Sequence, residues 1–201
     1  FATGQIRDLE TLSVFAPDGR AVVTQTRTIM VWPDGSVRWA AVAFEPVDGP
    51  GLYWMREGKR LPARDMVEEK GGIIRVDNGE VAFRFSKSGT GCVESIDAYG
   101  PEGKLIPIVQ GTVCGDLVIT RHDGQLFRAS LSGEARKIVI EETGPVRAVV
   151  RIEGKCRSEI GTSLFDFAFR WKTFRNRPEV ILEVTWANTT DSPSEQVRDV
   201  H

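Results

Sequence analysis

The chain has 201 residues, enough for one or two domains with a sizeable core. Hydrophobic residues make up 41% of it and charged residues 27%, as in an ordinary soluble globular protein. The 26 basic and 28 acidic residues give a formal net charge of −2, so the charge balance excludes a general affinity for nucleic acid or anionic membranes. Since no apolar run is long enough to cross a bilayer, we also expect no membrane-spanning helix.

The first predicted elements are two hairpins with near-identical turns, Ala16-Pro17-Asp18-Gly19 and Trp32-Pro33-Asp34-Gly35. Proline presets the first central position of such a turn, and glycine takes the left-handed conformation that closes it. Further turn signals follow at short intervals, at residues 77–79, 101–103, 122–124 and 176–178. This spacing predicts an all-β protein rather than one that alternates strands with helices.

Strict alternation between the turns predicts antiparallel strands with one buried face. It is clearest where Val81, Phe83 and Phe85 alternate with polar or small residues. The same pattern recurs at residues 146–153, 165–172 and 180–187. The only helix that the sequence allows is a short one around residues 65–70, and this segment has too few apolar positions to predict a helix there.

A domain boundary is predicted near Leu61–Arg64, where a compact series of short strands gives way to longer, aromatic strands. We therefore expect a small RIFT-like β-barrel over residues 1–62. An antiparallel β-sandwich is expected over residues 63–201. Because the alternation continues to the last residue, we expect the sandwich to be incomplete, with exposed strand edges that could pair two copies in a homodimer.

The first residues and the cysteines give information about the cellular compartment. Residues 1–8 have neither a basic region nor an apolar region of a signal peptide. The chain has three cysteines, Cys92, Cys114 and Cys156, and they are widely spaced. The odd number argues against a disulfide framework, and the spacing argues against a zinc site. A cytoplasmic location is the expectation that fits both features.

Residues for catalysis are scarce. The chain has two histidines, His122 in a turn and His201 at the last position, and neither has a suitably spaced nucleophile or set of metal ligands. Gly89-Thr90-Gly91 resembles a phosphate loop, but no helix pattern follows it. The sequence therefore predicts no catalytic residue, no metal site and no cofactor in this chain.

Aromatic residues next to arginines are the best candidates for ligand binding. Trp39 follows Arg38, Trp32 precedes the second turn, and Trp171 follows Arg170. Aromatic rings stack on sugar faces, and the arginine fork binds carboxylates with two hydrogen bonds. We therefore expect Trp32, Arg38, Trp39 and Arg170 to contact an acidic oligosaccharide; the alternative is that the tryptophans belong to the core and the arginines to a solvated face.

The octapeptide from Trp32 to Trp39, with the preceding segments Gly4–Leu9 and Asp18–Arg20, resembles the N-terminal RIFT-barrel domain of the exo-rhamnogalacturonan lyase (YetA-like) family. Residues 71–103 and 169–188 are similar to strands of the central β-sandwich of that family. The octapeptide also has a structural interpretation, in which Trp32 and Trp39 pack across the hairpin and Arg38 binds Asp34 or the turn carbonyls.

The resemblance implies that this chain is the N-terminal β region of a larger carbohydrate-active enzyme. Lyases of this kind remove the proton next to a uronate carboxylate, and they need a base and a cation for that step. Since no catalytic residue of the family falls on a matching position here, we expect the chain to be inactive alone and to act with missing C-terminal domains of the same polypeptide. The alternative is a non-catalytic sugar-binding or domain-assembly β module.

Overall fold

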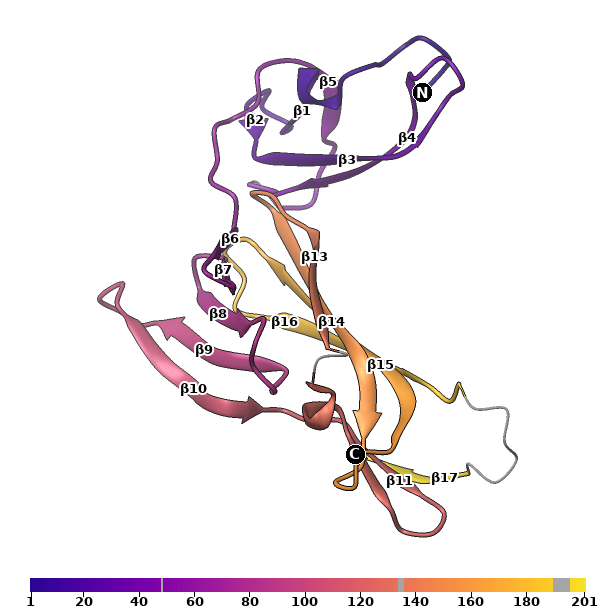
Figure 1. The fold of residues 1–201 in the computed structure, drawn as a ribbon. Helices are drawn as coiled ribbons and strands as arrows, with labels where there is room; N and C mark the ends of the chain where they lie inside the picture. The colour runs from indigo at the N-terminus through magenta and orange to yellow at the C-terminus, as the bar shows by residue number, and fades with distance from the viewer. Residues whose placement is uncertain (48, 134–135, 190–195) are drawn as a thin grey trace. The chain divides into compact units, whose positions relative to one another are not determined.

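The computed structural model describes residues 1–47, 49–133, 136–189 and 196–201, with only the backbone at 112–114. Its regular structure is β-strand, and the described strand pairs are antiparallel (Figure 1). Within the described residues, the helices are two three-residue 3₁₀ turns, η1 (Leu9–Thr11) and η2 (Ala129–Leu131). The predicted all-β class is confirmed.

The chain divides into two compact units, residues 1–66 with 144–147, and residues 67–143 with 148–201. The first unit has a three-stranded sheet in the order β2-β1-β5 and a two-stranded ribbon of β3 and β4. Its strands are β1 (Leu12–Phe15), β2 (Ala21–Val22), β3 (Thr24–Val31), β4 (Val37–Phe44) and β5 (Trp54–Glu57).

Two small apolar clusters form the core of the first unit. One joins Leu9, Leu12 and Val37, and the other joins Val14 and Val22 with the fully buried Ala16. Polar side chains are buried in this unit as well, among them Ser13, Thr24, Gln25 and Ser36.

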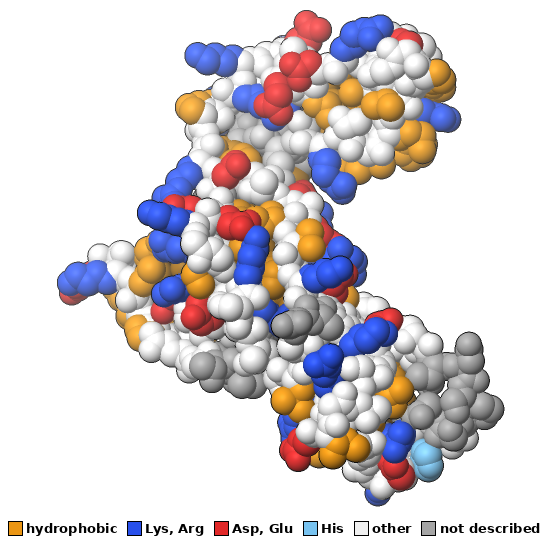
Figure 2. Space-filling view, in the orientation of Figure 1, with side chains coloured by type: hydrophobic (Ala, Val, Ile, Leu, Met, Phe, Trp, Pro, Cys, Tyr) orange, Lys and Arg blue, Asp and Glu red, His pale blue; other side chains and the backbone are white. Residues whose placement is uncertain are grey.

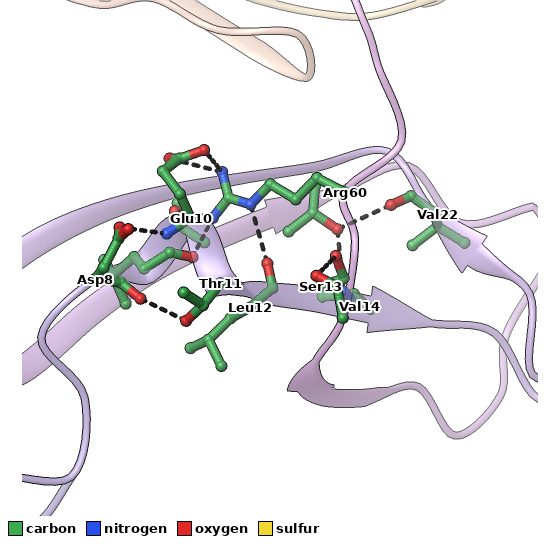
Figure 3. A network of polar contacts seen from close by, with 12 residues as sticks. Asp8, Glu10, Thr11, Leu12, Ser13, Val14, Val22 and Arg60 are labelled. Atoms are coloured by element: carbon green, nitrogen blue, oxygen red, sulfur yellow. Dashed lines mark hydrogen bonds and ion pairs between the residues drawn. The ribbon is translucent and has the colours of Figure 1, made fainter.

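Arg60 is a further polar side chain with several hydrogen-bond partners in this unit (Figure 3). Its Nε donates to the carbonyl oxygen of Leu12 at 2.9 Å, and its Nη2 donates to the carbonyl oxygen of Leu9 at 2.5 Å and to the hydroxyl of Thr26. Its Nη1 donates to both carboxylate oxygens of Glu10 at 2.8 and 2.9 Å. Arg60 thus joins η1, β1 and β3 through one guanidinium group.

Gln25 explains why residues 144–147 belong to the first unit. Its buried amide oxygen accepts hydrogen bonds from the backbone N–H groups of Val146 and Arg147 at 3.0 and 2.9 Å. Its amide nitrogen donates to the carbonyl oxygen of Arg147 at 3.0 Å. The side chain therefore binds this short segment as a neighbouring strand would.

Both predicted Pro-Asp-Gly turns are confirmed. Gly19 and Gly35 have φ of 85° and 81°, and their N–H groups donate to the carbonyl oxygens of Ala16 and Trp32, each at 2.9 Å. In each turn the aspartate accepts a hydrogen bond from the backbone N–H two residues later. The two turns are equivalent because the same three residue types set the same backbone angles.

The second unit is built from two sheets. The first has the order β10-β9-β8-β7-β6, and the second has the order β16-β15-β14-β12-β11-β17 with β13 paired to β14. The strands of the first sheet are β6 (Val67–Lys70), β7 (Ile73–Asp77), β8 (Val81–Ser86), β9 (Val93–Tyr99) and β10 (Leu105–Cys114). Those of the second are β11 (Val118–Arg121), β12 (Leu126–Arg128), β13 (Lys137–Glu142), β14 (Arg147–Arg157), β15 (Ser163–Phe174), β16 (Val180–Ala187) and β17 (Val197–Val200).

Aromatic side chains join the two sheets, which form two layers in Figure 1. Phe83 and Phe85 of β8 each lie 5.9 Å, ring centre to ring centre, from Trp171 of β15. Phe167 and Phe169 are buried on the same strand as Trp171. The predicted buried faces of β8 and β15 are thereby confirmed.

Asn78 adds a polar connection between the same sheets. Its side-chain nitrogen donates to Thr173 Oγ1 at 2.6 Å and to the carbonyl oxygens of Phe174 and Arg177 at 3.0 and 2.7 Å. Its side-chain oxygen caps the β7–β8 turn by accepting from the N–H groups of residues 80 and 81. The turn of one sheet is thus fixed to the β15–β16 turn of the other.

The segment around residues 65–70, the only helix that the sequence allowed, is not helical. Val67–Lys70 is strand β6, which pairs with β7 through a turn at Gly71 and Gly72. Both glycines have positive φ, 59° and 78°. Two consecutive residues in that conformation form the tight turn that matches the twist of a hairpin, and glycine adopts it without steric cost.

The predicted burial of one face of β16 is not observed. Leu182, Val184 and Trp186 lie opposite Trp171, Phe169 and Phe167 of β15, yet each is between 37% and 47% exposed. Strand β16 is at the edge of its sheet, and the described residues leave this part of the apolar face open to solvent.

The surface carries both signs of charge, interspersed on the face shown in Figure 2. No helix among the described residues has the length and hydropathy to traverse a bilayer.

Candidate functional site

The β3–β4 ribbon contains the octapeptide that the sequence singled out. The pairing joins Thr28 to Ala40, Met30 to Trp39 and Val31 to Val37, so Ile29 and Arg38 are extra residues without a cross-strand partner. Such bulges bend a strand and change which way the next side chain points.

The bulge at Arg38 explains the exposure of Trp39. Regular alternation would put residues 37 and 39 on one face. With Arg38 inserted between them, Val37 is buried in the core with Leu9 and Leu12, whereas the side chain of Trp39 points outward and is 62% exposed. Neighbouring apolar residues on the ribbon, Met30 and Val31, are about half exposed. Trp39 is therefore a surface residue and is not part of the described core.

Trp32 and Arg38 form a pair on the same hairpin. The guanidinium carbon of Arg38 lies 4.3 Å from the ring centre of Trp32, within the range of a cation–π contact. The indole N–H of Trp32 donates to the carbonyl oxygen of Phe1 at 3.1 Å. The structure thus brings two of the four predicted residues into contact, and Trp39 follows Arg38 on the same strand.

Arg7 and Ser36 hold the turn of this hairpin at Asp34, where Arg38 was expected to bind. Arg7, and not Arg38, donates to the carbonyl oxygen of Asp34 at 3.0 Å and pairs with its carboxylate at 3.5 Å. Hydrogen bonds from Ser36 lower the pKa of Asp34. The hydroxyl of Ser36 also accepts from the N–H of Gly4 at 2.9 Å. These bonds fix the turn and leave the guanidinium of Arg38 on Trp32.

Arg170, the fourth predicted residue, lies in the second unit and is part of a network of ion pairs. Its Nε donates to Glu141 at 2.9 Å, which raises the pKa of Arg170. Arg151 lies 3.0 Å from the other oxygen of Glu141 and 3.2 Å from Glu153. The neighbouring Lys172 pairs with Glu183. Arg170 is thus already bound across the sheet, as the alternative of a solvated charged face predicted.

The two tyrosines of the chain, Tyr53 and Tyr99, are both donors in hydrogen bonds. Tyr99 donates to Asp77 at 2.8 Å, and this bond raises the pKa of Tyr99. Tyr53 donates to the carbonyl oxygen of Gly49 at 3.1 Å. His201 lies 3.0 Å from Asp199. In the described part of the chain, no three His, Cys, Asp or Glu side chains are grouped in a way that could hold a metal ion.

A polar groove in the second unit was not anticipated from the sequence. It has a volume of about 610 Å³ and lies on the sheet of β6–β10, on the side away from the aromatic core. Its walls include Arg84 of β8, Asp97 of β9, Gln110 of β10 and Arg136, which precedes β13. The signal for it was present in the alternation of β8: Arg84 lies between the buried Phe83 and Phe85, which places it on the outer face, and Ser95 of β9 is its cross-strand partner.

These features define the class of protein: an antiparallel β chain whose first unit carries an octapeptide hairpin and whose second unit is a two-layered sandwich. A family model described as the PcRGLX-like N-terminal RIFT barrel domain matches residues 1–56. A second, described as the PcRGLX-like protein central beta sandwich domain, matches residues 66–199. The chain therefore belongs to the PcRGLX-like family, which confirms the resemblance inferred from the octapeptide.

One relative in sequence and one neighbour in fold are both longer than this chain. The uncharacterized protein YetA of Bacillus subtilis (strain 168) is 24% identical over 158 residues, which are 75% of this chain and 18% of that protein. An alpha-mannosidase from Enterococcus faecalis V583 matches with a TM-score of 0.56 and 12% identity over 89% of this chain and 25% of its own. At that identity the likeness concerns the fold alone. The chain spans about a quarter or less of the length of both.

Proposed function

We propose that this chain is the N-terminal β region of a larger carbohydrate-active enzyme resembling exo-rhamnogalacturonan lyases, and that the catalytic part lies outside it. Family membership supports this assignment, as does the short share of YetA that the chain covers. The fold likeness to a protein named as an alpha-mannosidase is consistent with it. Tyr53 and Tyr99 donate hydrogen bonds to other acceptors, which argues against either as the base of an elimination.

Within that enzyme, the role proposed for the first unit is to hold an acidic oligosaccharide. The observation that carries this role is the outward ring of Trp39 at a bulge, on the same hairpin as Arg38, whose guanidinium lies over Trp32. An exposed ring of this size leaves a flat apolar surface that can stack on the C–H face of a sugar. The guanidinium of Arg38, on the same hairpin, supplies paired donors for a uronate carboxylate.

A binding measurement tests the role of Trp39. We expect a rhamnogalacturonan oligosaccharide to bind the chain in isothermal titration calorimetry, and Trp39→Ala to weaken binding about tenfold, which corresponds to ~1.4 kcal/mol. Trp54→Ala is the matched control, since Trp54 is 49% exposed in the same unit but lies on β5. Unchanged affinity of Trp39→Ala, or an equal loss for Trp54→Ala, would refute a specific platform at Trp39.

A turnover measurement tests the position of the catalytic part. We expect the 201-residue chain to release no unsaturated product from the same oligosaccharide, whereas a longer polypeptide of the same family does. Product formation by this chain alone contradicts the proposal.

The alternative is a non-catalytic sugar-binding or assembly module that acts by itself. It shares the binding prediction for Trp39, so affinity cannot separate the two functions. The two functions differ in the activity of the longer polypeptide. If the module is non-catalytic, the longer polypeptide should not turn over the oligosaccharide.

The open apolar face of β16 favours packing against further polypeptide of the same protein, which is the partner we propose for it. Leu182, Val184 and Trp186 are apolar, contiguous and exposed at a sheet edge. Exposed edges of this kind pair readily with other strands, so a homodimer of the isolated chain is the competing arrangement. Sedimentation analysis distinguishes them, because Val184→Lys should make a dimeric chain monomeric and should leave a monomeric chain unchanged.

A further inference from the structure

We propose that the polar groove on β8, β9 and β10 is a second ligand site, which binds a saccharide through its carboxylate group. The inference rests on the proposed function for the class of ligand, and it assigns a site in the second unit, separate from the Trp39 platform. With a volume of about 610 Å³, the groove is within the usual size range of small-molecule sites and can take two or three sugar rings.

Arg136 is the first of two cations that point to an anionic group. It is partly buried, and its Nη1 and Nη2 donate to the carbonyl oxygens of Ser86 and Gly91 at 2.9 and 2.8 Å. Its printed partners among the described residues are these two carbonyl oxygens and no carboxylate, and burial lowers its pKa. A guanidinium removed from water without an opposite charge is costly, so an incoming carboxylate would be stabilised there.

Arg84 is the second cation. It projects from the outer face of β8 and is half exposed. Its Nε lies 3.9 Å from the carboxylate of Glu94, at the outer limit of an ion pair, whereas Arg60 and Arg170 lie within 3 Å of theirs. Arg84 therefore keeps donors that a ligand in the groove can reach.

Acceptors line the same walls. Asp97 and Gln110 lie on β9 and β10, and Asp97 Oδ2 is 3.4 Å from the hydroxyl of Ser95, a long contact. Carboxylate and amide oxygens accept hydrogen bonds from sugar hydroxyls, while the two arginines match a carboxylate.

The groove is a poor match for other partners. Among the described lining residues, Val93 is the single aliphatic one beyond glycine, so this part of the groove offers no aromatic or apolar centre of the kind found in protein-binding surfaces. The groove combines oxygen atoms that can accept hydrogen bonds from sugar hydroxyls with two arginines that can bind a carboxylate. This combination favours an acidic saccharide.

Trigalacturonate is a suitable probe, titrated into the ¹⁵N-labelled 201-residue chain and followed by amide chemical shifts. We expect shifts at residues 84–97, 110–111 and 136. We expect the neutral methyl ester to bind at least tenfold more weakly. Arg84→Gln should cause a similar loss, and Arg128→Gln, a surface arginine paired with Asp116 in the other sheet, should cause none.

The outcomes separate this site from the Trp39 platform. If trigalacturonate shifts residues around Trp39 alone, the groove proposal is wrong and the proposed function stands. If the ester binds as tightly as the acid, or if Arg84→Gln changes nothing, recognition of a carboxylate is wrong. If sulfate ions alone compete at equal concentration, the groove is a general anion site, which also overturns the proposal. If the amide signals shift neither in the groove nor around Trp39, both proposals are wrong.

Discussion

Substitution of Arg60 by alanine offers a strong test of how the first unit is stabilised. The side chain is 17% exposed, and it donates to the carbonyl oxygens of Leu9 and Leu12 as well as to Glu10. Loss of a hydrogen-bond donor to a buried acceptor costs about 1–3 kcal/mol. The pair with Glu10, whose side chain is 70% exposed, adds about 0–1 kcal/mol at most, because surface ion pairs contribute little.

These contributions sum to a loss of about 3 kcal/mol in the free energy of unfolding. In a unit of this size, each kcal/mol lowers the melting temperature by roughly 4–8 °C, so we expect a fall of about 15 °C. Differential scanning calorimetry measures it directly. Trp32, Trp39 and Trp54 all lie in this unit, so tryptophan fluorescence provides a second measurement.

Two variants make the Arg60 test specific. Arg60→Lys keeps the charge opposite Glu10 but lacks the guanidinium fork that reaches two carbonyl groups. It should therefore lose most of the free energy of unfolding that Arg60→Ala loses. Arg27→Ala removes an exposed arginine of β3 and should leave the melting temperature within about 2 °C, as surface substitutions usually do. A wild-type melting temperature for Arg60→Ala, or full rescue by lysine, would refute the argument.

Two further predictions concern the second unit. Asn78→Ala removes a buried side chain that makes three hydrogen bonds to the β15–β16 region, and it should lower the free energy of unfolding by about 2–4 kcal/mol in urea titrations; a change below ~0.5 kcal/mol contradicts this role. Burial raises the pKa of the Cys156 thiol from 9.0 to about 12. Because the unfolded chain ionises first, the stability due to this thiol is present below pH 9 and is lost as the pH rises from 9 towards 12. Urea titrations at pH 8 and pH 10.5 should therefore show a larger loss for wild type than for Cys156→Ala, and equal losses would contradict the assignment.

Local sequence was enough to predict the turns and the strongly alternating strands. The turns at Gly19 and Gly35 depend on three adjacent residues each, and the buried side of β15 follows from a period of two. The turn at Gly71 and Gly72 is equally local, since two consecutive glycines favour a hairpin.

The candidate site was less predictable because it depends on pairing. The outward direction of Trp39 requires the bulge at Arg38, which depends on the register against β3 and which no residue type signals by itself. The partner of Arg170 is Glu141, 29 residues away on a different strand. The polar groove likewise requires four segments to meet, and sequence alone does not place Arg136 beside Ser86.

The partners of the arginines offer a physical way to separate scaffold from binding residues. Arg60 and Arg170 each have a carboxylate within 3 Å, and Arg60 also binds two backbone carbonyls. Arg38 lies on an aromatic ring, and Arg84 has its carboxylate only at 3.9 Å. Substituting a paired arginine leaves a polar partner unsatisfied and therefore lowers stability. Arg38 and Arg84 make few contacts that stabilise the fold. Substituting either should therefore lower ligand affinity and leave the melting temperature nearly unchanged. Glutamine variants of all four, compared in melting temperature and in oligosaccharide affinity, should divide into these two pairs, and a uniform loss of stability across the four would contradict the distinction.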